Sequence, residues 1–465
     1  MSNPGDADAT PITSTRQLAE YLAVGGKPRA RFSIGTEHEK FGFRQSDFTA
    51  PPYEPGGIRA VLEGMAAADD WEPILDRGNP IGLKKDNASV SLEPAGQLEL
   101  SGGLAATLHE TESELAAHLA LVRQVAGPLG IGFAPLGFHP TLTRAQMPWM
   151  PKGRYAIMRR HMPRVGTLGL DMMTRTCTVQ VNLDFADEAD MVRKMRVALA
   201  LQPVATALFA NSPFTEGRPN GYLSYRAHVW SDTDPTRTGT PPVFFEDGFG
   251  FERYAEWLVD SVPMYFVYRN GHYVDLAGQS FRRFMQGAFA GSQAGITEAG
   301  ITEAGIATMG DAADHLTTVF TDVRLKRFIE MRGADAGTPE MMVAQSALWV
   351  GLLYDEAALA AAAALVRRHP WTEFAALRPL VARQALDAPW QAGTVRDLAR
   401  DVVAIARDGL AARARCDSQG RSESALLAPL EALVAGAPTQ AERWLALFHG
   451  EWNGDITGIF RAAAI

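Results

Sequence analysis

The alternation of apolar and polar positions is clearest in residues 31–43, where Phe41 and Phe43 follow two acids in the run IGTEHEKFGF. Side chains on a strand point alternately to its two faces, so Glu37 and Glu39 share one face. We therefore predict a strand here with both carboxylates on the same side. Neighbouring carboxylates repel each other, and a bound cation would remove that cost. The alternative is an edge strand whose charges face solvent.

Residues 88–101 alternate in the same way, and the pattern breaks at the Pro-Ala-Gly of residues 94–96. This predicts a β-hairpin with a three-residue loop. In that register Glu99 lies opposite Ser91, with Glu93 on the same face. A two-residue loop would instead place the carboxylates on different faces, because a shift of one residue turns every side chain over.

The remaining elements follow from the same periodicities. We predict helices at 16–24, 56–69, 107–126, 187–211, 251–261 and 280–286, strands at 131–138, 177–185 and 324–332, strand pieces in 71–85, and a hairpin at 264–276. From Pro339 onward the pattern is helical. Antiparallel strands followed by helices indicate an α+β fold. The tandem AGITE repeat in 294–305 is interpreted as a surface loop without a catalytic role.

Composition and charge exclude several classes of protein. The chain has 465 residues and a net charge of −9, so nucleic acid is not an expected partner. Its only cysteines, Cys177 and Cys416, form neither a disulfide framework nor a CxxC metal site. No apolar run reaches membrane-spanning length and the first residues carry no targeting pattern, so we expect a cytoplasmic protein that does not enter a membrane.

A third pair of charged residues, Glu330 and Arg332, is also two positions apart and shares a face of the predicted strand 324–332. Three strands that bring acids to one place could hold two or more Mg²⁺ ions, with ATP phosphates completing the shell. Arg332 could then neutralise charge on a transferring phosphoryl group. The alternative is an ordinary surface ion pair. The chain has no P-loop motif, so an ATP site would be built from the sheet and metal ions.

Substrate carboxylates need a guanidinium fork, and the loop from Tyr225 onward offers Arg226 and Arg237. The alternative is salt bridging within that loop to its own aspartates. Gln180 and Asn182, two apart on the strand at 177–185, could add uncharged ligands or hydrogen bonds. A buried polar pair that only closes a hydrogen-bond network would look the same.

Seven stretches in order resemble the plant and proteobacterial type of glutamate–cysteine ligase, and together they cover most of residues 30–355. They are IGTEHEKFGF, LEPAGQLELSGG, RTCTVQVNLDF, LALQPVATALFANSPF, YRAHVWSDTDPTRTG, VPMYFVYR and RLKRFIEMRGAD. The resemblance implies a glutamine-synthetase-like fold in which an antiparallel sheet curves into a funnel with helices outside. It also implies the reaction: ATP phosphorylates the γ-carboxylate of glutamate, and the cysteine amine attacks the acyl phosphate to give γ-glutamylcysteine, the first step of glutathione biosynthesis.

The resemblance also assigns residues. Metal ligands are expected at Glu37, Glu39, Glu93, Glu99 and Glu330, the catalytic pair at Glu330 and Arg332, nucleotide contacts at Glu39 and Arg332, and substrate contacts at Tyr225, Arg226, Arg237, Gln180 and Asn182. Gln180 falls where related ligases of another class place a histidine. The whole chain is expected to be one catalytic domain, with a disordered start at 1–13, a sheet core at 14–335 and a mainly helical part at 336–465.

Three rival functions remain open at this point. A sibling carboxylate–amine ligase would use another amine acceptor, a non-catalytic protein would keep the fold only to bind a metal or ligand, and a glycosidase would use two of the carboxylates without nucleotide. The expected partners are glutamate, cysteine and ATP, and the expected state is a monomer or weak homodimer. Plant members are regulated through paired cysteines, and we predict no comparable disulfide here.

Overall fold

A large antiparallel sheet forms the centre of the protein. The computed structural model describes residues 8–289 and 305–465. Within these residues the sheet strands are β1 (Ile34–Arg44), β2 (Glu72–Asp76), β3 (Asn79–Lys85), β4 (Ala88–Leu92), β5 (Leu98–Ser101), β6 (Ile131–Ala134), β7 (Thr178–Leu183), β14 (Val323–Leu325) and β15 (Ile329–Asp335). Their order is β14-β15-β7-β1-β5-β4-β3-β2, with β6 beside the end of β1, and neighbouring strands run antiparallel. The predicted α+β class is confirmed.

Strand β1 lies at the middle of this sheet, between β7 and β5. Its alternation separates two environments. Glu37 and Glu39 face one side, whereas His38 and Lys40 are buried on the other, where the Lys40 ammonium donates to the Leu98 carbonyl oxygen at 3.2 Å. A strand buried on both faces has its register fixed, because a slip of one residue would exchange these two sets.

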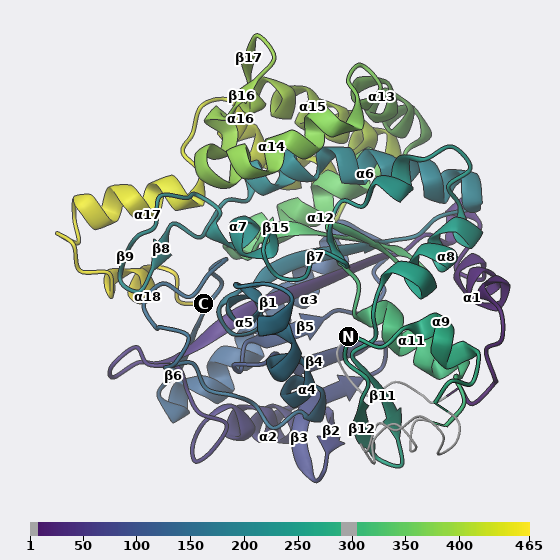
Figure 1. Ribbon diagram of the computed structural model, residues 1–465. Helices are drawn as coiled ribbons and strands as arrows, with labels where there is room; N and C mark the ends of the chain where they lie inside the picture. The colour runs from purple at the N-terminus through teal and green to yellow at the C-terminus, as the bar shows by residue number, and fades with distance from the viewer. Residues whose placement is uncertain (1–7, 290–304) are drawn as a thin grey trace.

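Helices cover the sheet and build the C-terminal part. They are α1 (Thr15–Ala23), α2 (Ile58–Ala68), α3 (Leu108–Ala126), α4 (Gly153–His161), α5 (Gly169–Arg175), α6 (Glu188–Leu208), α7 (Tyr225–Trp230), α8 (Phe251–Ser261), α9 (Phe281–Met285), α11 (Met309–Thr317), α12 (Pro339–Leu353), α13 (Glu356–Val366), α14 (Trp371–Gln384), α15 (Val395–Arg413), α16 (Ala428–Val434), α17 (Gln440–His449) and α18 (Gly458–Ala462). Figure 1 shows α13 to α16 gathered beyond α6 and α12, away from β2 to β4. Helix α12 is buried almost all round and packs on the sheet, where Ser346 hydrogen-bonds Thr36 at 2.8 Å.

Four two-stranded ribbons lie outside the main sheet. They are β8 (Phe214–Thr215) with β9 (Arg218–Pro219), β10 (Thr238–Gly239) with β13 (Phe320–Thr321), β11 (Phe266–Arg269) with β12 (His272–Asp275), and β16 (Pro389–Trp390) with β17 (Gly393–Thr394). The ribbon of β11 and β12 is the hairpin predicted for 264–276, and its strands pair Phe266 with Asp275. This prediction is therefore confirmed.

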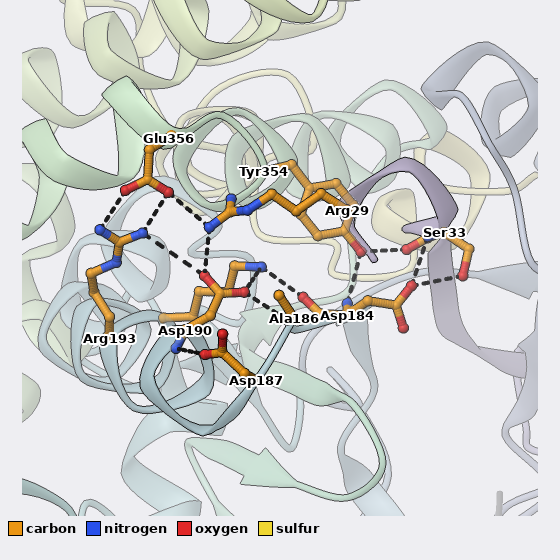
Figure 2. Close-up of polar contacts among 10 residues, drawn as sticks. Arg29, Ser33, Asp184, Ala186, Asp187, Asp190, Arg193, Tyr354 and Glu356 are labelled. Atoms are coloured by element: carbon orange, nitrogen blue, oxygen red, sulfur yellow. Dashed lines mark hydrogen bonds and ion pairs between the residues drawn. The ribbon is translucent and has the colours of Figure 1, made fainter. Parts of the chain in front are cut away.

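A charged network ties the start of β1 to the C-terminal helices (Figure 2). Arg29 bridges Asp190 at the start of α6, at 3.3 Å, and Glu356 at the start of α13, at 2.8 Å. The Tyr354 hydroxyl accepts from the backbone N–H of Asp184 at 2.8 Å and donates to the Ser33 carbonyl oxygen. The strand that carries the acids is therefore anchored to two helices that are distant in sequence.

Two predictions about elements are wrong. The run at 324–332 is not one strand but two, β14 and β15, which turn at 326–328 and pair Arg324 with Glu330. The disordered start predicted for 1–13 is wrong for 8–13, because Ile12 is buried and Pro11 bridges Thr308. The repeat at 294–305 lies outside the described residues except for its last position.

Among residues 8–289 and 305–465, no single helix is long and apolar enough to cross a membrane. Helices α12 and α13 reach that length and apolar composition only together, and the chain bends by 90° at the break between them.

Candidate active site

The acids of β1 and of the β4–β5 hairpin meet in one cleft, which we call the acidic cleft. Its lining comprises Glu37, Glu39, Glu93, Pro94, Gln97, Glu99, Arg154, Tyr155, Met158, Met172, Met173, Thr176, Thr178, Gln180, Arg226, Trp230, Thr317, Phe320, Arg324 and Arg332. The predicted strand and hairpin thus bring four carboxylates together. Arginines lie across the same cleft from them.

The hairpin has the predicted register. Glu99 pairs with Ser91 across β4 and β5, and with Glu39 across β5 and β1. The Ser91 hydroxyl donates to the Glu99 carboxylate at 2.9 Å, and the Glu93 backbone N–H closes the loop on Gln97 at 2.9 Å. Because Glu39 and Glu99 are direct cross-strand partners, their side chains leave the sheet side by side.

Burial and mutual repulsion perturb these carboxyls. Burial, followed by the charges of Glu99 and Glu93, raises the pKa of Glu39 well above its ordinary value. Burial and the charges of Glu93 and Glu37 raise the pKa of Glu99 to about 8. A cation bound beside these two carboxyls would favour their ionised forms and lower both pKa values.

The donor set fits a hard divalent cation, because carboxylate oxygens are the ligands such ions prefer. In the described part of the chain, no three Asp, Glu, His or Cys side chains lie close enough together to hold a metal ion by themselves. Water or substrate oxygens would therefore have to complete the coordination shell, which is usual for Mg²⁺.

Glu330 lies behind the acidic cleft and is fully buried. Arg324 holds its carboxylate with two contacts, at 2.5 and 2.9 Å, and Arg332 and Lys326 approach to 3.1 and 3.4 Å. Burial alone would raise the pKa of Glu330, but these three cations hold it well below its ordinary value. Arg324 and Arg332 line the cleft itself. The metal role predicted for Glu330 stays a prediction, and this one carboxylate offsets part of the positive charge of Arg324, Arg332 and Lys326.

The two arginines left open by the sequence lie in different places. Arg226 lines the acidic cleft, donates to the Arg332 carbonyl oxygen at 3.0 Å and has its guanidinium 5.8 Å from the ring of Trp230. Arg237 is fully buried outside the cleft, where it pairs with Asp234 at 2.7 Å. The alternative interpretation, a salt bridge within the loop, therefore describes Arg237.

Of the three other predicted substrate residues, one lines the acidic cleft and two do not. Gln180 lines the cleft and accepts from the Arg332 guanidinium. Asn182 donates to the Glu37 carboxylate at 2.7 Å but does not line the cleft. Tyr225 packs edge-on against Phe138 at 4.8 Å between ring centres, also away from the cleft lining.

A second cavity of about 430 Å³ adjoins the acidic cleft, and we call it the adjoining hollow. Arg226, Trp230, Phe320 and Arg332 line both cavities. Most of the other lining residues of the hollow come from α6, α7 and α14, and they include Arg378 and Arg383, which the sequence did not single out. Arg324 was missed as well, because the turn at 326–328 carries neither Gly nor Pro.

Comparison with known proteins decides the family. The family model for glutamate-cysteine ligase family 2 (GCS2) matches residues 33–462. The chain belongs to this family. Three relatives in it are chloroplastic glutamate–cysteine ligases: that of Nicotiana tabacum is 48% identical over 97% of this chain and 83% of its own length, enzyme B of Oryza sativa subsp. japonica 47% over 97% and 87%, and that of Arabidopsis thaliana 46% over 97% and 83%.

The comparisons confirm the predicted fold and correct one expectation. A glutamate–cysteine ligase from Francisella tularensis, solved in complex with AMP, superimposes with a TM-score of 0.54 at 10% identity over 93% of this chain and 87% of that one. The glutamine-synthetase-like fold expected from the resemblance is consistent with this ligase architecture. The predicted cytoplasmic location is contradicted by these family relatives, which are named chloroplastic.

Proposed function

We propose that the protein ligates the γ-carboxylate of glutamate to the amine of cysteine with ATP, and that the acidic cleft is where this happens. Phosphoryl transfer from ATP to the γ-carboxylate gives γ-glutamyl phosphate and ADP. The amine nitrogen of cysteine then attacks the acyl carbon, phosphate leaves, and the amine loses a proton to give γ-glutamylcysteine. The observation that carries the proposal is the meeting of four carboxylates with Arg226, Arg324 and Arg332 in one cleft of a family member.

The chain's own residues have distinct roles in this scheme. Glu39, Glu93 and Glu99 would each offer carboxylate oxygens to Mg²⁺, with water or phosphate oxygens completing the shell, and the bound ion would screen the phosphate charges of ATP. Arg332, fixed by Gln180 and Glu330, presents positive charge to the transferring phosphoryl group. No side chain has to act as a nucleophile, since positioning and charge stabilisation carry this kind of transfer.

Arg226 is the residue we propose for gripping a substrate carboxylate. It is the one of the two candidate arginines that reaches the cleft, and a planar guanidinium binds a carboxylate through two parallel hydrogen bonds. The shared walls of the acidic cleft and the adjoining hollow place it between the two cavities. It can therefore orient an amino acid beside the metal-binding acids.

The test is release of ADP from the purified protein with ATP, Mg²⁺ and glutamate, with cysteine present, withheld, or replaced by other amines. Release that requires glutamate and is fastest with cysteine supports the proposal. A preference for another amine would keep the mechanism and change the acceptor, whereas no release with any acceptor would refute it.

A second arm tests the metal ligands. Glu39→Gln should raise the Mg²⁺ concentration needed for half-maximal turnover at least tenfold, because one charged oxygen donor is lost. The matched control is Glu20→Gln, an exposed carboxylate on α1 that pairs with Arg16 at 3.0 Å. An unchanged Mg²⁺ requirement in Glu39→Gln would refute the assignment.

A further inference from the structure

Asp335, at the end of β15, is a buried carboxylate outside both cavities. Its two oxygens accept three hydrogen bonds from neutral donors. The Asn211 backbone N–H and the Ser212 hydroxyl bind one oxygen at 2.9 and 2.6 Å, and the Ser224 hydroxyl binds the other at 2.8 Å. The carboxylate is only 1% exposed, so these hydrogen bonds must compensate for its removal from water.

The hydroxyl groups of the two serines connect Asp335 to the first turn of helix α7. An ionised carboxylate only accepts, so both hydroxyl protons point toward Asp335 and leave the hydroxyl lone pairs free. Those lone pairs accept two backbone N–H groups in the first turn of α7: the Ser212 hydroxyl accepts from Arg226 at 3.1 Å, and the Ser224 hydroxyl accepts from Ala227 at 3.3 Å. The carboxylate therefore orients the two hydroxyl groups that bind the start of this helix.

Arg226 extends from that first turn of α7. Its guanidinium reaches back to the carbonyl oxygen of Arg332, three residues before Asp335 on the same strand. Both ends of Arg226 are thus tied to β15, at its backbone through Ser212 and at its side chain through Arg332. Because Arg226 lies between the acidic cleft and the adjoining hollow, a small shift of this turn changes where its guanidinium points.

We propose that Asp335 is a positioning residue that holds Arg226 in place for binding a substrate carboxylate, acting through Ser212 and Ser224. This inference rests on the proposed function for the role of Arg226, and it gives Asp335 a role in that function. Misplacement of a binding group by about 1 Å can cost about 100-fold in rate. Replacing Asp335 should therefore impair activity more than replacing a buried carboxylate far from the cleft.

The central experiment is a cycle of Asp335→Asn, Arg226→Lys and the double variant, with KM and kcat measured for each substrate. Asparagine keeps the shape, but its amide N–H₂ must donate to a serine, which leaves a hydroxyl proton without an acceptor. We expect Asp335→Asn to raise one amino-acid KM about 10- to 100-fold with a smaller change in kcat. Arg226→Lys should raise the same KM, and the double variant should be less than about 2-fold worse than Arg226→Lys alone.

Additive losses in the double variant, or ordinary KM values in Asp335→Asn, would overturn the inference. The matched control is Glu423→Gln, another fully buried carboxylate, which binds the Leu108 N–H at 2.7 Å and Arg413 at 3.0 Å and lines neither cavity. It should lower stability and leave every KM unchanged.

Two further measurements keep the test decisive. If Asp335→Asn does not fold, Ser224→Ala replaces it, and the same KM should rise by a smaller factor; no rise overturns the inference. A crystal structure of the folded variant needs no activity: the Arg226 guanidinium should leave the Arg332 carbonyl oxygen, and an unmoved guanidinium overturns the inference. A wild-type protein that releases no ADP with glutamate and cysteine would instead refute the proposed function, and the crystal structure would still decide the role of Asp335.

Discussion

Glu330→Gln should destabilise the folded protein strongly, because it removes a negative charge in direct contact with three buried cations. Glu330 is 0% exposed, and Arg324, Arg332 and Lys326 approach its oxygens to 2.5, 3.1 and 3.4 Å. Breaking a buried ion pair from one side costs about 3–5 kcal/mol, since the remaining charge stays buried. The glutamine amide would also point N–H groups at guanidinium donors.

The loss in melting temperature follows from the size of the chain. An unfolding entropy of about 2.1 cal/mol/K per residue gives about 1 kcal/mol/K for 465 residues, so the melting temperature should fall by about 3–5 °C. The assays are urea unfolding and calorimetry without nucleotide. Glu20→Gln, which breaks an exposed pair, should cost less than about 0.5 kcal/mol. A Glu330→Gln loss within about 1 kcal/mol of wild type would refute the reasoning.

A double-mutant cycle separates the pair from its surroundings. Arg324→Met alone leaves Glu330 with two cations, whereas the double variant removes both partners of the shortest contact. Replacing both members of a buried pair is far less costly than removing one. The sum of the losses in unfolding free energy of the two single variants should therefore exceed the loss of the double variant by at least about 2 kcal/mol.

Three further outcomes are expected. Burial and the charge of Arg237 lower the pKa of His315 to about 3, so below about pH 6.5 the unfolded chain binds a proton that the folded chain does not. This histidine should therefore lower the free energy of unfolding by about 1.4 kcal/mol per pH unit between about pH 6.5 and pH 3. His315→Gln should reduce this pH dependence in urea titrations. Cys416→Ser and the intact protein should run alike on a non-reducing gel, since Cys177 is buried and Cys416 is exposed, and a crosslink lost with Cys416 would contradict this. Gly137→Ala should raise the same KM as Asp335→Asn, because its new Cβ would lie 2.4 Å from the Asp335 carboxyl carbon; an unchanged KM would contradict the packing argument.

The acidic half of the candidate site could be predicted from the sequence. The alternation around Glu37 and Glu39 places both carboxylates on one face of β1, and the loop at 94–96 sets the register of the hairpin. The predicted pairing of Ser91 with Glu99 is confirmed, whereas the pairing of Glu39 with Glu99 across β1 and β5 came only with the structure. Local periodicity was sufficient because each element carries its own signal.

The basic half could not be predicted in the same way. The sequence placed Arg226 and Arg237 in one loop, but Arg226 lies in the first turn of α7. Tertiary contacts distinguish the two arginines: Arg237 pairs with Asp234, and Arg226 donates to the carbonyl oxygen of Arg332. The sequence did not single out Arg324, because the turn between β14 and β15 contains neither Gly nor Pro and the two strands therefore looked like one. Such choices depend on residues far apart in sequence, and no periodicity records them.

The sheet order explains why opposite charges remain available in one cleft. The acids lie on β1 and β5, the cation-bearing strand is β15, and β7 lies between β1 and β15. Neighbouring strands are about 4.8 Å apart, so one intervening strand separates the two rows by about 10 Å. The residues that β7 presents there are the neutral amides Gln180 and Asn182, one bound to Arg332 and the other to Glu37.

These amides satisfy each charge without neutralising it. Gln180 lies opposite the point where the register of β15 shifts between Met331 and Ala334, so the bulge turns Arg332 toward the cleft while its carbonyl oxygen receives Arg226. Glu330 is one carboxylate shared among Arg324, Lys326 and Arg332, so positive charge remains in this group. Had β7 carried an acid at 180, a second carboxylate would offset that remaining charge from within the sheet. With a neutral spacer, the carboxylates of β1 and the guanidinium of β15 can both be neutralised by what enters the cleft, which is the arrangement that a cation and a phosphoryl group together require.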